Sequence, residues 1–192
     1  MPYRRAVLSL TGVLAAGPAL AHVGAGATHG FAAGFAHPLG GLDHLLAMVT
    51  VGLLAACLGG RAIWVVPTSF IVMMLAGAML GVAGLQLPAV ELVVAGSVVV
   101  LGAAVVVGKQ SPLTLAAVLA GSFALFHGFA HGSEMPPAAD AGAYAAGFTV
   151  ATLLLHTVGL GIGRLTGSGP ALVRAAGAAV AAVGLVLAFQ VA

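Results

Sequence analysis

Seven ionisable side chains lie in or directly beside long apolar runs of this sequence. They are His37, Asp43, His44, His127, His131, Glu134 and His156. Ionisable groups are costly inside a bilayer, and those that occur there usually serve a site. Imidazole nitrogens and carboxylate oxygens together suit borderline divalent ions such as nickel, cobalt or zinc. Because Cys57 is the single cysteine, the paired thiolates of a copper(I) or iron–sulfur site are absent from the sequence, and we expect a divalent transition-metal site.

The first group of candidate ligands is His37, Asp43 and His44. On a continuous helix, residues seven apart differ by about 20° around the axis, so both histidines would face one groove. Pro38 would disturb the helix between them. Asp43 would be either a direct oxygen ligand or an acceptor that fixes the tautomer of an imidazole. The alternative is a helix start capped by Asp43 with two interfacial histidines, which leaves both imidazoles unexplained.

The second group is His127, His131 and Glu134. Their spacings of four and three residues place all three on one stripe of a helix. Two prolines, Pro136 and Pro137, follow and are expected to stop that helix, so the group lies at its end. His156 stands alone within an apolar run. It either makes a hydrogen bond to a neighbouring helix or lines a path for an ion deep in the membrane.

The composition is typical of a membrane protein. Hydrophobic residues make up 61% of the 192 residues, charged residues 5%, and the mean hydropathy is +1.20, whereas soluble domains are about 25% charged. With about 20 apolar residues per crossing, six spans are predicted, at residues 38–59, 62–85, 88–107, 112–132, 141–163 and 170–191. We expect an all-α transmembrane helix bundle forming one domain, residues 22–192, with the lipid bilayer and no nucleic acid as partner. Gly77, Gly81 and Gly84 have the spacing that lets helices pack closely.

The first 21 residues have the pattern of a cleavable signal peptide. Arg4 and Arg5 precede an apolar stretch at 6–16, and a small-residue cleavage pattern ends at Ala21. The alternative is an uncleaved signal anchor. Cleavage after Ala21 would start the mature chain at His22, with His29 close behind, and we expect these two histidines to gather metal outside the membrane.

Basic residues predict the orientation of the bundle. Four of them lie in or next to the connections after the first, third and fifth spans: Arg61, Lys109, Arg164 and Arg174. The connections after the second and fourth spans have no lysine or arginine, and the latter carries Glu134 and Asp140. The positive-inside rule therefore places the odd connections in the cytoplasm of a bacterial inner membrane, with both ends of the mature chain outside.

Two stretches carry a resemblance to a known family. Residues 34–48 read GFAHPLGGLDHLLAM and residues 126–134 read FHGFAHGSE. Together they resemble the HupE/UreJ family of nickel and cobalt permeases, and the similarity extends over nearly the whole chain. The resemblance implies secondary uptake of nickel, or of cobalt in some members, for the maturation of hydrogenase or urease. It also implies that the two ligand groups described above handle the metal.

Three classes of function fit these features. The first is a permease without enzymatic activity or resident cofactor, in which nickel or cobalt, or alternatively zinc, passes from His22 and His29 to both ligand groups and His156. No Walker motif is present, so the membrane potential would drive transport. The second is an intramembrane hydrolase with a catalytic zinc, although the ligands outnumber one site. The third is a metal sensor or accessory protein, for which we would expect a soluble domain. The sequence leaves both the metal and a homo-oligomeric state open.

Overall fold

The computed structural model describes residues 30–165 and 170–192, and within these ranges every regular element is a helix. The helices are α2 (Gly30–Gly40), α3 (Leu42–Leu58), α4 (Ala62–Val82), α5 (Val90–Val107), the short 3₁₀ helix η1 (Gly108–Gln110), α6 (Leu113–Ser133), α7 (Ala141–Leu165) and α8 (Pro170–Val191). The predicted all-α fold is confirmed for this part of the chain. The predicted signal peptide, His22 and His29 lie outside the described residues.

Five helices are long and apolar enough to cross a membrane, namely α4, α5 with η1, α6, α7 and α8. The pair of α2 and α3 passes the same criterion together, although the two are bent by 85° relative to each other. The described residues therefore form five spans, or six if the bent pair is counted as one, and the protein is a multi-pass helical membrane protein. The predicted boundaries differ from the observed ones by at most three residues in α4 to α8. α4 ends at Val82 and not at residue 85, because Gly84 follows with a φ of 74°. α5 begins two residues later than predicted.

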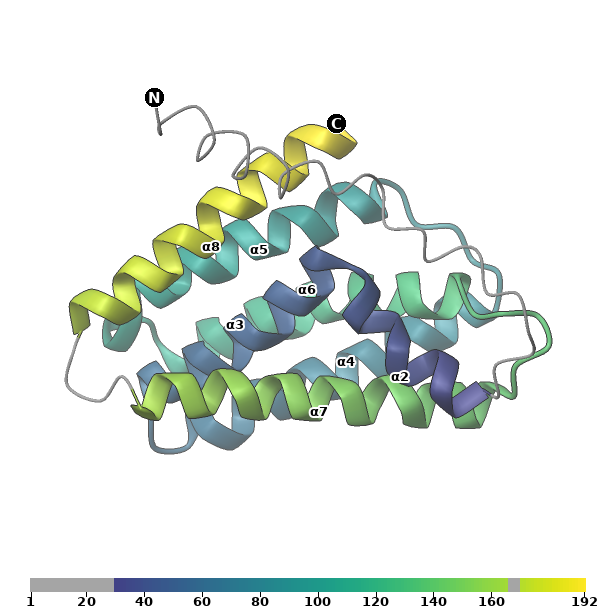
Figure 1. Cartoon of the computed structure of the whole chain (residues 1–192), viewed down its shortest axis with the longest axis horizontal. Coiled ribbons are helices and arrows are strands. Elements are labelled where there is room, and N and C mark those ends of the chain that lie inside the picture. Colours follow the sequence, from purple (N-terminus) through teal and green to yellow (C-terminus); the bar gives the residue numbers. More distant parts are fainter. Residues whose placement is uncertain (1–29, 166–169) are drawn as a thin grey trace, which may run out of the picture.

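The predicted first span, residues 38–59, corresponds to α3 and the end of α2, with a sharp bend between them. The helix breaks at Gly41, whose φ of −107° and ψ of 123° are extended, and α2 lies across the end of the bundle against α7 (Figure 1). Pro38 is inside α2 and is not the point of the break. Two consecutive glycines, Gly40 and Gly41, weaken the helix there because glycine loses the most backbone entropy on becoming helical.

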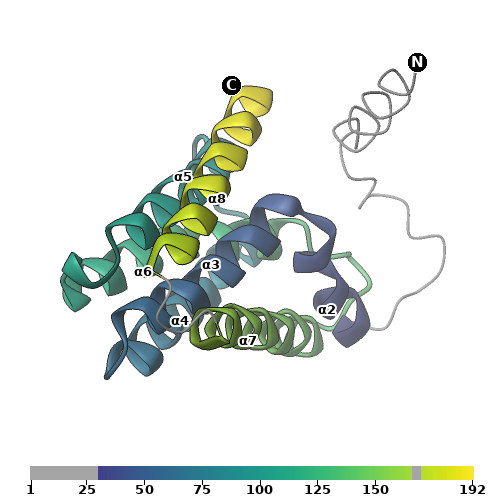
Figure 2. The same cartoon turned by 60° about the vertical axis from the view of Figure 1, so that its left-hand side comes forward.

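The helices pack in close pairs. α4 lies against α6, α5 against α8, and α3 against α7 (Figures 1 and 2). α2 packs against the first half of α7. Backbones touch at these contacts: a Cβ on Gly128 of α6 would collide with the carbonyl of Met74 in α4, and one on Gly159 of α7 with the carbonyl of Val49 in α3. Small residues therefore allow the close approach on which helix association in lipid depends.

The predicted packing role holds for Gly77 and Gly81, because a Cβ at either position would meet the backbone of α6. It is wrong for Gly84, which lies in the turn after α4 with open space around it. Gly84 is suited to this turn because glycine adopts a positive φ without steric cost.

The register of the contacts fixes the direction of each helix. Gly52 of α3 meets α7 at His156, and Ala56 meets it farther along at Gly163. Gly77 of α4 meets α6 at Leu125, and Gly81 meets it farther along at Ser133. The members of each of these pairs therefore run parallel. Consequently the connections after α3, α5 and α7 lie at one end of the bundle, which we call the basic end. The start of α3 and the connections after α4 and α6 lie at the other, which we call the histidine end. Which end faces the cytoplasm stays a prediction.

Candidate metal centre

Four histidines from three helices meet at the histidine end. The ring centroid of His44 lies 4.7 Å from that of His127 and 4.9 Å from that of His131. The ring centroid of His37 lies 4.7 Å from that of His131 and 6.1 Å from that of His44. We call these four residues the histidine cluster. The straight-helix argument for His37 and His44 fails at Gly41, yet the bend brings the two rings together.

His37 and Glu134 form the most exposed side of this cluster. His37 Nε2 lies 3.5 Å from Glu134 Oε2, and the two side chains are 16% and 47% exposed. The Tyr144 hydroxyl lies 2.9 Å from the other ring nitrogen, Nδ1. Glu134 is the first residue after α6, with φ −97° and ψ 6°, so its carboxylate reaches α2 from the helix end. The cluster thus has a negatively charged, partly exposed mouth.

Asp43 holds the ring of His44 in one tautomer. Its Oδ1 accepts the backbone N–H of His44 at 2.7 Å and lies 2.9 Å from His44 Nδ1. Because an ionised carboxylate can only accept, Nδ1 carries the proton and Nε2 keeps its lone pair. Nε2 is buried without a hydrogen-bond partner. The alternative of Asp43 as a helix cap is wrong, since the N-cap position of α3 is Gly41 and no side chain caps it.

His127 is held in the opposite tautomer by Ser97 of α5. The Ser97 hydroxyl donates to the carbonyl of Val94 at 2.6 Å, and its oxygen lies 2.9 Å from His127 Nε2. With its one proton used, the hydroxyl accepts from Nε2–H, so the lone pair of His127 lies on Nδ1. That Nδ1 is buried and has no hydrogen-bond partner.

His131 completes a set of three buried imidazoles. It is fully buried, its ring stacks on Phe148 at 4.9 Å, and neither of its nitrogens has a hydrogen-bond partner. Buried polar atoms are nearly always paired, so unpaired ones need an explanation. His44, His127 and His131 each keep one lone pair that could bind a metal ion.

In the conformation described, the rings do not converge on a point. Among residues 30–165 and 170–192, no three His, Cys, Asp or Glu side chains are arranged to hold a metal ion. The rings pack edge to face instead, with interplanar angles of 66° to 81° within the cluster. Coordination of one ion by several of them therefore requires the rings to rotate.

His156 lies apart from the histidine cluster. It is 3% exposed in α7, and its ring meets the edge of Phe70 at 5.2 Å. Phe70 also lies 5.7 Å from His127, so this aromatic ring contacts both histidines. The alternative of an interhelical hydrogen bond is wrong for this conformation, because both nitrogens of His156 lack a partner.

Sequence reasoning missed a stripe of side chains on α7. Tyr144, Phe148, Thr152 and His156 are spaced by four, which places them on one helix face. Tyr144 contacts His37, and Phe148 contacts His131. Thr152 contacts the sulfur atoms of Met48 and Met74. His156 contacts Phe70. The spacing was a usable signal. For Ser97 the sequence holds no comparable signal, because it is one hydroxyl residue in an apolar run.

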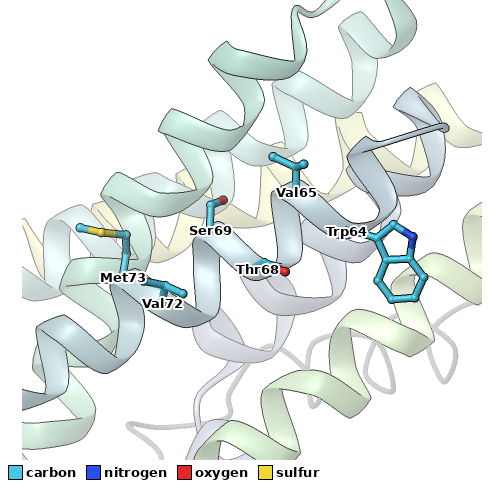
Figure 3. A pocket seen from close by; sticks show the side chains of 6 residues that line it. All are labelled: Trp64, Val65, Thr68, Ser69, Val72 and Met73. Carbon is cyan, nitrogen blue, oxygen red and sulfur yellow. The ribbon is translucent and has the colours of Figure 1, made fainter.

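A recess with a volume of about 510 Å³ lies on the outer side of α4. Figure 3 shows its lining residues along one helix, from Trp64 to Met73. None of them is a His, Asp, Glu or Cys, and the exposed ring of Trp64 suits a membrane interface. This recess does not compete with the histidine cluster as a metal centre.

Comparison with known proteins identifies the family. The model of the HupE / UreJ protein family matches residues 9–187. The chain belongs to the HupE/UreJ family. Protein HupE of Rhizobium leguminosarum bv. viciae is 43% identical over 189 residues, which cover 97% of this chain and 98% of that relative. No solved structure matches the chain significantly. The resemblance drawn from the two histidine motifs is thereby confirmed, whereas the metal-binding roles of individual residues stay predictions.

Proposed function

We propose that this member of the HupE/UreJ family is a secondary permease that takes up a divalent transition-metal cation, nickel or cobalt, through the histidine cluster. The observation that carries the proposal is the set of buried, unpartnered imidazole nitrogens on His44, His127 and His131, next to the carboxylates of Asp43 and Glu134. The metal is cargo here, and the chain needs no resident cofactor.

The spacing of the rings supports shared coordination. With metal–nitrogen bonds of about 2.0–2.1 Å, imidazoles that bind one ion at tetrahedral or octahedral angles have ring centres roughly 4.5–5 Å apart. The centroids of His44 lie 4.7 Å from His127 and 4.9 Å from His131. Rotation of the side chains, without a shift of α3 relative to α6, then suffices to direct the nitrogens at one ion.

The order of groups along α7 suggests a path. A cation first meets Glu134 and His37 at the mouth, then the buried imidazoles, and then passes Phe70 to reach His156. Neutral imidazoles replace part of the hydration shell without adding charge to the interior. The membrane potential supplies about 2.3 kcal/mol per charge per 100 mV, and so about twice that for a divalent cation.

In the proposed orientation the histidine end faces the periplasm and the bundle lies in the inner membrane. His22 and His29 would collect the ion outside, and the cell would use it in the maturation of hydrogenase or urease. This orientation rests on the basic residues of the opposite end and on the predicted signal peptide.

Uptake of radioactive nickel, with cobalt as competitor, tests the proposal in cells or proteoliposomes. Five single alanine variants should impair uptake while the protein still inserts. Replacement of His37, His44, His127 or His131 should abolish it, and Asp43→Ala should raise the KM by about 10- to 100-fold. His156→Ala tests the deep part of the path, and Thr157→Ala is its matched control because Thr157 is the exposed neighbour on α7.

Two outcomes contradict the permease. In one, all five variants transport at the wild-type rate with normal amounts in the membrane. In the other, the wild-type protein binds one tightly held zinc ion and moves no metal, which is the behaviour of the intramembrane hydrolase.

A further inference from the structure

A cavity of about 450 Å³ opens at the basic end, opposite the histidine cluster. Its wall comes from the last turns of α3, α5 and α7, from η1 and from the start of α8. The lining residues used below are Cys57, Val105, Val107, Lys109, Val173 and Arg174. The volume is within the range of small-ligand sites, roughly 300–1,000 Å³.

Two cationic side chains face this cavity without a carboxylate. The whole sequence has four acidic residues, Asp43, Glu91, Glu134 and Asp140. All four lie at the histidine end: at the start of α3, in the first turn of α5, and on either side of the connection from α6 to α7. Among the described residues, the ion pairs involve only histidines, so no carboxylate neutralises Lys109 or Arg174.

The remaining wall combines apolar side chains with the polar side chain of Gln110. Val105, Val107 and Val173 line the cavity together with the side chain of Cys57. Lys109 and Arg174 are themselves exposed, so an anion bound between them would keep contact with water, and the apolar side chains would contact any alkyl group attached to it. Arginine binds phosphate oxygens through a planar fork and lysine as a point charge.

We propose that this cavity binds a phosphate group, supplied either by the headgroup of an anionic phospholipid or by free phosphate. Basic pockets between membrane helices bind lipid phosphates in this way. The valine side chains offer contacts to the glycerol and first acyl carbons of a lipid.

A bound phosphate would join two parts of the bundle. Lys109 follows α5 and Arg174 belongs to α8, whereas Cys57 belongs to α3, which packs on α7. The α5–α8 pair contacts the α3–α7 pair less extensively than the members of each pair contact one another. A phosphate held by Lys109 and Arg174 thus links η1, which follows α5, to α8, and a lipid that also contacts Cys57 adds α3, so its binding raises the thermal stability of the protein.

The test uses the full chain purified in detergent, with bound lipid measured by native mass spectrometry and the unfolding temperature measured in parallel. Probes are phosphatidylglycerol, phosphatidylcholine and inorganic phosphate. Phosphatidylglycerol should bind and raise the unfolding temperature, and the double variant Lys109→Gln, Arg174→Gln should weaken its binding on the order of tenfold or more. Arg61→Gln is the matched control, because Arg61 lies at the same end but outside the cavity.

The arms of the experiment separate the two sources of phosphate. Binding of phosphatidylglycerol that excess inorganic phosphate does not displace identifies a lipid site, whereas stabilisation by inorganic phosphate alone identifies a site for the free ion. Equal binding of phosphatidylcholine and phosphatidylglycerol overturns the proposal. Loss of binding in Arg61→Gln as large as in the double variant also overturns it, since the basic surface as a whole would then attract the lipid. Mass spectrometry reads binding even if the double variant is less stable.

Discussion

Replacement of Asp43 provides the sharpest test of how the histidine cluster works. Its carboxylate lies 2.9 Å from His44 Nδ1 and leaves the buried Nε2 with a lone pair. Asp43→Ala removes the group that fixes this tautomer. Loss of such an orienting partner typically costs 10- to 100-fold in metal affinity or activity, which is about 1.4–2.7 kcal/mol. We expect the KM for nickel uptake to rise by that factor.

Asp43→Asn should have an intermediate effect. The amide oxygen can accept the same hydrogen bond from His44, but it carries no charge, and charge-assisted hydrogen bonds are roughly twice as strong as neutral ones. Half of the free energy is then retained, so the expected loss is about three- to tenfold. The graded series of Asp, Asn and Ala is the signature of an orienting residue.

The assay is uptake over a range of nickel concentrations, with the amount of protein in the membrane measured by immunoblot. Asp140→Asn is the matched control, because Asp140 is an exposed carboxylate at the same end that accepts the backbone N–H of Ala143. If Asn is as damaging as Ala, the charge of Asp43 acts on the ion directly. If both variants keep the wild-type KM, the tautomer argument is refuted.

Four further predictions follow from the sequence and the packing. Acidification below the usual imidazole pKa of about 6.5 should weaken nickel binding to the detergent-solubilised protein, because imidazoles must be neutral to bind metal, and an affinity independent of pH contradicts this. A reporter fused after Ala192 should be periplasmic and one near Lys109 cytoplasmic, and the reverse pattern removes the model of capture outside. Deletion of residues 22–29 behind a working signal should lower uptake at low nickel and spare the maximal rate, so a lost maximal rate is the contrary result. Gly128→Ala should lower the amount of folded protein, because its Cβ would meet the Met74 carbonyl; unchanged thermal stability would show that α4 and α6 can separate at little cost.

The sequence predicted the helices well and their packing partners hardly at all. Apolar runs and the breaks at Gly59–Gly60, Pro112 and Pro136 mark the ends of α3, α6 and their neighbours. Hydropathy has no information on which helix lies beside which, since every helix is apolar around most of its circumference. The pairing of α4 with α6 depends on four glycines, Gly77, Gly81, Gly128 and Gly132, and nothing in the sequence marks these four as partners among the 29 in the chain.

The candidate site was predicted in its residue types and only partly in its geometry. The two motifs named all members of the histidine cluster, because ionisable residues stand out in an apolar chain. They could not reveal Ser97, which orients His127 from a different helix, since one buried hydroxyl looks like any other. His156 was found, but the contact of its ring with Phe70, which also contacts His127, depends on tertiary packing.

The break at Gly41 brings the rings of His37 and His44 together, which a straight helix would not do. On a straight helix His37 would lie about 10 Å along the axis from His44, above the level of the other rings. The 85° bend turns α2 over the end of the bundle and brings the centroids of these two rings to 6.1 Å. His127 and His131 are fixed by the close packing of α6 on α4, whereas α2 packs mainly on α7. The bend therefore gives the cluster its fourth ring, and it places His37 beside Glu134 at the mouth, where an ion entering the cluster would meet it first.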